Sequence, residues 1–72
     1  MEIAKTLKTL MINKGVKHIE VAQKLGIEKQ NFSNKLKVKN FRITDIEKIA
    51  DIIGYDVKLQ FIDRETGKVI EA

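Results

Sequence analysis

The spacing of apolar residues changes once along this 72-residue chain, at Gly54. Before Gly54, apolar residues recur at intervals of three and four, which is the period of an amphipathic helix. After it, apolar and polar residues alternate from Tyr55 to Phe61, which is the period of a strand with one buried face. The spacing therefore predicts a mainly α fold. A compact four-helix domain over residues 1–54 should be followed by a C-terminal strand or hairpin over 55–72, which could serve as a dimerisation element of the same domain.

Three helices are expected before residue 40. The first begins near Ile3 and should stop at 13–15, where Asn and Gly can take the left-handed conformation that ends a helix. The second covers about 18–25 and the third about 28–37. Gly26 lies between them, where a sharp turn needs positive φ.

The fourth helix and the tail have their own start and stop signals. Thr44 can cap the fourth helix while Glu47 reaches back to it, which is a capping box, and Gly54 should end the helix. Residues 63–67 have turn chemistry, so 68–71 could return as a second strand.

The small size and the composition exclude several classes of site. The chain has a mass of 8.3 kDa and contains no cysteine, so disulfides and thiolate metal sites are both excluded. Its single histidine, His18, cannot form a histidine-rich metal cluster or a Ser-His-Asp arrangement that could be argued from sequence, and no glycine-rich phosphate loop is present. We therefore expect no enzyme activity, no metal and no cofactor. Because so short a chain buries only about 60% of its unfolded surface, association with a second copy is the expected reinforcement.

Charge is unevenly distributed along the chain. Residues 1–42 carry ten Lys/Arg against three acids, and residues 43–72 carry four against seven, giving +7 and −3. A basic front and an acidic back suggest a polyanionic partner approached from one side, although lysine-rich solvated faces fit the charge equally well. Neither a secretory signal nor an apolar tract of membrane-spanning length is present, so we expect a cytoplasmic protein without membrane contact.

Residues 21–27, with Phe32 and Leu36 downstream, have the spacing of two short helices that cross at a steep angle. Ala22 supplies the small residue that a close helix crossing needs, and Gly26 supplies the tight turn. In such a pair the second helix projects from the surface. This is the part of the sequence that points most directly to function.

The pattern resembles the helix-turn-helix domains of the lambdoid phage repressors and Cro, the XRE-like regulators, over about residues 3–54. The resemblance implies a sequence-specific double-stranded DNA-binding regulator, of the repressor kind, whose third helix enters the major groove while the amino end of the second touches phosphate. By family position, Lys29, Gln30 and Asn34 are the base readers.

Helix geometry leads to a similar set of residues. Phe32 and Leu36 define the buried side of the third helix, so residues on the other side face outward. Amides can bond bidentately to adenine and lysine can donate to guanine, and no carboxylate occurs between Lys29 and Arg42. The competing interpretation is an ordinary solvated polar face. The candidate base-reading residues are Lys29, Gln30, Ser33 and Asn34.

Several other cationic or polar side chains are candidates for the DNA backbone, where each neutralised phosphate makes binding more sensitive to salt. Lys17 and His18 depart from the resemblance, since the family usually has Ser or Thr and then Gln there. The missing cap oxygen should weaken that helix start, and a ring N–H of His18 could replace the usual amide contact. The candidate backbone contacts are Lys17, His18, Asn31, Lys35, Lys37, Lys39, Asn40 and Arg42.

The tail must bury the apolar face formed by Val57, Leu59 and Phe61, because an isolated hairpin is marginally stable at best. It could pack on its own helices, or it could pair across a two-fold axis to make a homodimer, as Cro-like proteins do with a C-terminal strand. We favour the homodimer, since it also adds stability and matches a palindromic site. The alternative function is an antitoxin-like or adaptor module that uses the tail to bind a different protein.

Overall fold

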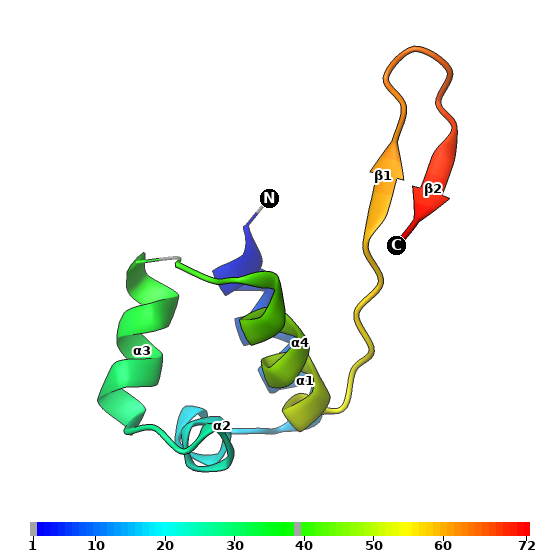
Figure 1. Ribbon diagram of the computed structural model, residues 1–72. Helices are drawn as coiled ribbons and strands as arrows, with labels where there is room; N and C mark the ends of the chain where they lie inside the picture. The colour runs from blue at the N-terminus through cyan, green and yellow to red at the C-terminus, as the bar shows by residue number, and fades with distance from the viewer. Residues whose placement is uncertain (1, 39) are drawn as a thin grey trace.

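The computed structural model describes residues 2–38 and 40–72. Four helices are followed by two short strands, which confirms the predicted mainly α fold with a terminal hairpin (Figure 1). Helix α4 packs against both α1 and α2, and α2 packs against α3. The elements are α1 (Ile3–Lys14), α2 (His18–Leu25), α3 (Lys29–Val38), α4 (Ile43–Ile53), β1 (Gln60–Ile62) and β2 (Val69–Glu71).

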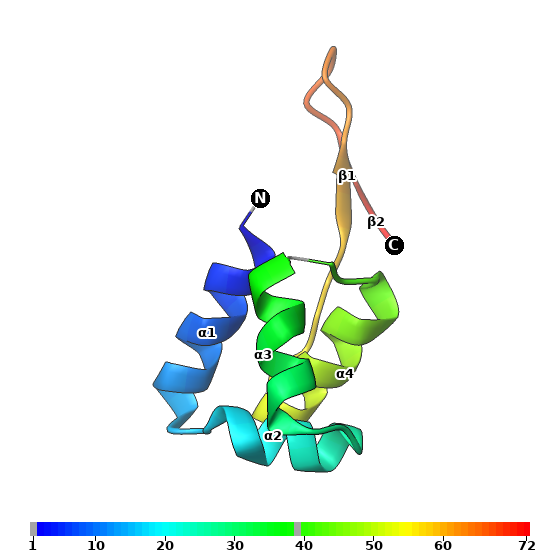
Figure 2. The ribbon, with the colours of Figure 1, turned by 90° about the vertical axis from the view of Figure 1, so that its left-hand side faces the viewer.

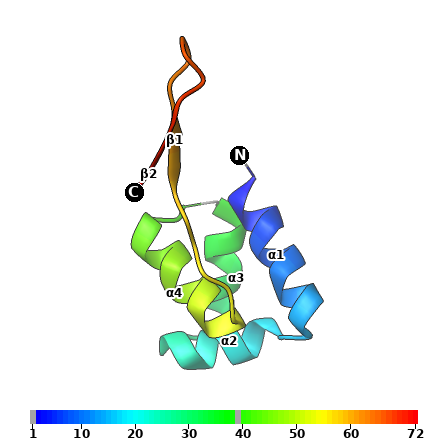
Figure 3. The same ribbon diagram turned by 90° about the vertical axis from the view of Figure 1, so that its right-hand side faces the viewer.

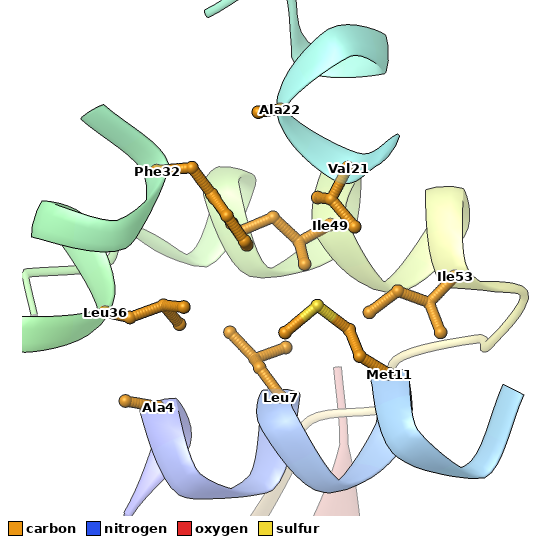
Figure 4. Packing of buried hydrophobic residues seen from close by; sticks show 9 residues of the cluster. All are labelled: Ala4, Leu7, Met11, Val21, Ala22, Phe32, Leu36, Ile49 and Ile53. Atoms are coloured by element: carbon orange, nitrogen blue, oxygen red, sulfur yellow. The ribbon is translucent and has the colours of Figure 1, made fainter. Parts of the chain in front are cut away.

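One apolar cluster holds the four helices together, and each helix contributes to it (Figure 4). Phe32 and Val21 are completely buried, and no polar or charged side chain among the described residues is buried. Full burial of a side chain of this size contributes roughly 1.5–3 kcal/mol. The predicted inward positions of Phe32 and Leu36 are confirmed. The cluster consists of Ala4, Leu7, Met11, Val21, Ala22, Phe32, Leu36, Ile49 and Ile53.

The turn between α2 and α3 is closed by Gly26. Its φ is +75°, and its N–H donates to the Gln23 carbonyl at 3.1 Å. The N–H of Ile27 donates to the Ala22 carbonyl at 3.0 Å, so two otherwise unpaired carbonyls at the end of α2 are satisfied. Helix α3 then begins at Lys29, one residue later than predicted, and ends one residue later.

The capping box predicted at Thr44 and Glu47 is wrong. Helix α4 begins at Ile43, so Thr44 already lies in the first turn, and the residue before the helix is Arg42. The backbone N–H of Arg42 donates to Asp45 Oδ2 at 3.1 Å. This N–H is therefore hydrogen-bonded although no Ser or Thr hydroxyl caps the helix.

Helix α2 starts in a similar way. The N–H of Lys17 donates to Glu20 Oε1 at 3.2 Å. A lysine side chain has no acceptor to offer the N–H groups of the first turn, as the sequence predicted. Glu20 therefore supplies the carboxylate half of a capping box, and the other half is missing.

The hairpin is present but its strands are shorter than the alternation predicted. Pairing starts at Gln60 and not at Tyr55, and next to the first pair the N–H of Ala72 donates to the Leu59 carbonyl at 2.9 Å. In the turn, Asp63 Oδ1 accepts the N–H of Glu65 at 2.8 Å. The register places Phe61 opposite Ile70 and Ile62 opposite Val69.

After α4 the chain runs to the side of the molecule opposite α2. There the hairpin projects beyond the helices (Figures 1 and 3). All six residues of the two strands are exposed, including Phe61 at 60%. The two strands therefore do not pack on the helices, whereas Tyr55, at the start of the tail, is partly buried against the helical core. Val57 and Leu59 are exposed as well, at 42% and 38%.

Candidate nucleic-acid interface

Helix α3 is held by its apolar side and leaves its polar side uncovered. Phe32 and Leu36 point into the core, and Ala22 is 1% exposed on α2, which packs directly against α3. Figure 2 shows α3 in front of the other helices, while the hairpin extends from the far side of the body. The outward face of α3 is thus free to meet a partner along its length.

Three of the four predicted base-reading side chains are exposed on α3: Lys29, Gln30 and Asn34. Ser33, the fourth, is half-buried. Gln30 Nε2 donates to Asn34 Oδ1 at 3.2 Å, one helical turn apart. This bond was not predicted from the sequence, although the i,i+4 spacing of two amides was a usable signal. Such a pair stabilises a helix by about 0.2–0.5 kcal/mol.

The residues predicted to contact the DNA backbone lie around α3. Lys17, Asn31, Lys37, Asn40 and Arg42 are exposed, and His18 is half-buried. Lys39, a further candidate, lies outside the described residues. A polar hollow of about 220 Å³ near the α3–α4 loop is lined by Lys35, Asn40, Arg42 and Asp45, so three of the candidates share one hollow.

Lys35 has a partner inside the domain that was not predicted from the sequence. Its Nζ lies 3.7 Å from Asp45 Oδ2, and both side chains are partly exposed. The N–H of Arg42 lowers the pKa of Asp45 below its ordinary value of 3.8, and the charges of Lys35 and Arg42 act in the same direction against partial desolvation. Lys35 would have to leave this carboxylate to reach a phosphate.

The described part of the chain holds neither a metal-binding cluster nor a membrane-spanning helix. Among residues 2–38 and 40–72, no group of three or more His, Asp or Glu side chains is placed to hold a metal ion. No helix in that part of the chain is both long enough and apolar enough to cross a membrane.

A short helix, a glycine turn and a second helix with a free polar face define a helix-turn-helix, the arrangement in which the second helix is presented to the DNA major groove. The family model of the Cro/C1-type HTH DNA-binding domain matches residues 6–58, and the chain belongs to this family. Searches of curated proteins and of solved structures found no match. The family match includes most of α1, all of α2, α3 and α4, and the first residues of the tail, and it ends before β1. The protein is therefore a DNA-binding domain of the regulatory kind, with a hairpin that the family match does not include.

Proposed function

We propose that this protein is a sequence-specific double-stranded DNA-binding transcriptional regulator that inserts α3 into the major groove and represses by occluding a promoter. The observation that carries the proposal is the uncovered face of α3, which bears the amides of Gln30 and Asn34. Between Lys29 and Arg42 no carboxylate is present to repel phosphate. Uncharged amides flanked by cations are what groove recognition needs.

The four predicted readers have distinct roles in this proposal. The amides of Gln30 and Asn34 serve base recognition, and Lys29 donates to guanine acceptors from the first turn of α3. Ser33, being half-buried, contributes a hydroxyl that can donate or accept close to the helix surface.

The phosphate contacts come from both ends of the motif. Lys17 and His18 lie at the start of α2, where the backbone N–H groups also favour an anion. Asn31, Lys37, Asn40 and Arg42 follow along α3 and the loop after it. Lys35 joins them only if the ion pair with Asp45 opens, and Lys39 remains a candidate on sequence grounds.

A selection of bound duplexes from a random pool, followed by titration in fluorescence anisotropy, tests this proposal. Gln30→Ala should reduce the preference for the selected duplex over a scrambled one. Lys37→Ala should weaken both duplexes alike and reduce the slope of log K against log salt by about 1. Lys68→Ala, which removes the same charge from the hairpin, is the matched control and should leave binding unchanged.

Two results would reject the DNA-reading proposal. One is a pool from which no sequence is enriched. The other is a Gln30→Ala variant that retains the full preference for the selected duplex.

We also propose that the protein is a homodimer held by its hairpin. Directly opposite residues of an antiparallel pair share a face, so Phe61 and Ile70 lie on one face and Ile62 and Val69 lie on the other. These four side chains are between 48% and 64% exposed. A two-stranded hairpin with apolar pairs on both faces is marginal alone, and a second copy brings identical apolar faces and free strand edges to cover it.

Sedimentation equilibrium tests the dimer with a matched pair of substitutions. Phe61→Ser should shift the protein toward monomer, whereas Arg64→Ser, at the exposed turn of the same hairpin, should not. A dimer also predicts an inverted repeat among selected duplexes, with half-sites about 34 Å apart or a multiple of that. A wild-type protein that stays monomeric at all concentrations and selects single half-sites contradicts the dimer.

The second candidate function is an antitoxin-like or adaptor module that binds a different polypeptide. One observation favours it: the exposed hairpin begins after residue 58, where the match to the DNA-binding family ends. A stable complex with a different polypeptide that is lost in Phe61→Ser, together with failure to select any duplex, would favour this function over the DNA-reading one.

A further inference from the structure

We propose that Gln30 reads an adenine in the operator and that Asn34 is the positioning residue that holds the Gln30 amide in the orientation needed to do so. This inference rests on the proposed function and makes it more specific. It names one kind of base and gives the two exposed amides of α3 different tasks. It starts from the Gln30 Nε2 to Asn34 Oδ1 bond of 3.2 Å.

The direction of this bond decides which base edge Gln30 can match. One hydrogen of Nε2 is donated to Asn34, which leaves the second hydrogen of Nε2 and the whole of Oε1 unused. A donor beside an acceptor complements the N7 acceptor and N6 donor of adenine in the major groove. Guanine presents two acceptors, N7 and O6, on that edge. The Oε1 of Gln30 would therefore face an acceptor lone pair, which is unfavourable.

Asn34 also limits how freely Gln30 can move. Gln30 is exposed on the outward face of α3, and an unanchored glutamine loses several rotamers when it docks on a base. The bond one helical turn away removes part of that freedom before DNA arrives, so less is lost on binding. Asn34 accepts through Oδ1 and keeps both hydrogens of Nδ2 for a neighbouring group.

The experiment uses the full-length protein and single-base variants of its selected duplex. The position read by Gln30 is the one at which Gln30→Ala removes the base preference. At that position the wild-type protein should prefer adenine by about 5- to 150-fold, the range expected for one bidentate contact. Asn34→Ala should remove most of this preference.

Two substitutions separate positioning from a direct reading role. Asn34→Asp keeps an oxygen that accepts from Nε2, so it should retain the adenine preference while weakening binding to every duplex through repulsion of phosphate. Gln30→Glu replaces the amide with a carboxylate, which can only accept hydrogen bonds and to which the Asn34 amide can still donate. The base preference at this position should therefore move from adenine to cytosine, whose N4 is a donor.

The control variant is Asn13→Ala, which removes an exposed amide from α1, outside the proposed interface, and should leave the adenine preference intact. The inference is overturned if the Gln30 position prefers a base other than adenine. It is also overturned if Asn34→Ala alters the preference only at a different position, since Asn34 would then read its own base. A wild-type protein that selects no duplex rejects the proposed function itself and this inference with it.

Discussion

The rings of His18 and Phe32 meet at right angles, with centroids 5.7 Å apart and planes inclined by 89°. His18 is the first residue of α2, and Phe32 is the completely buried anchor of α3. The contact therefore ties the start of α2, where a phosphate is expected, to the inner side of the helix proposed to read bases.

Removing this ring contact should loosen the motif. We expect His18→Ala to lower the free energy of unfolding by about 0.5–1.5 kcal/mol, the range for a perpendicular aromatic pair. His18→Phe should lose less, because it keeps a ring at the same place. Urea unfolding followed by circular dichroism measures both, and an equal loss in the two variants would contradict a role for the ring.

Phe32 should be far more important to stability than Phe61. Phe32→Ala opens a cavity in the centre of the cluster and should cost about 3–5 kcal/mol, enough to remove a cooperative transition from so small a domain. Phe61→Ala starts from a side chain that is 60% exposed, so the unfolding of the helices should change little at concentrations where the protein is monomeric. A cooperative, near-wild-type transition in Phe32→Ala would refute the described core.

At Gly26 a side chain should cause no steric clash, but it should strain the backbone. Its φ is +75°, and a Cβ built there meets none of the described atoms within 4 Å. Gly26→Ala should therefore destabilise by about 1–2 kcal/mol from the left-handed conformation alone, and Gly26→Asn by less. Equal unfolding free energies for glycine and alanine would show that the turn adopts another conformation.

Acid should weaken the start of α4 through Asp45. The folded state lowers its pKa below 3.8, so ionised Asp45 stabilises the fold fully above that value. The contribution is lost as pH falls through 3.8 toward the folded pKa. The stability difference between wild type and Asp45→Asn should thus be constant near neutral pH and shrink in acid. Thermal unfolding across a pH series measures it, and a difference that does not change down to the lowest pH would rule out the charge as its source.

The helices and the core could be predicted because their signals are periodic. Phe32 and Leu36 recur one turn apart, and Gly26 occupies a turn that requires its left-handed backbone. The first residue of α4 could not be predicted from the sequence, because Asp45 lies three residues after Arg42 and Glu47 lies three residues after Thr44. Either pair has the spacing of a capping box. Which carboxylate receives an N–H depends on backbone geometry that the sequence pattern does not contain.

The site was predicted as a set of residues and not as a set of contacts. Exposure of Gln30 and Asn34 follows from helix geometry, but the bond between them depends on side-chain rotamers. The Lys35–Asp45 pair joins two helices, so its distance depends on how α3 and α4 pack. For the tail, the sequence pattern and the structure differ. Alternation around Phe61 indicates a buried face, but a single copy of the chain leaves that face exposed.

The claim that α3 presents a sequence-reading face to DNA is tested most directly by titrating ¹⁵N-labelled protein with a selected duplex. The side-chain amide signals of Gln30 and Asn34, and the backbone signals of residues 29–37, should show the largest changes. Changes confined to α1 or to the hairpin, with the signals of α3 unmoved, would contradict the account.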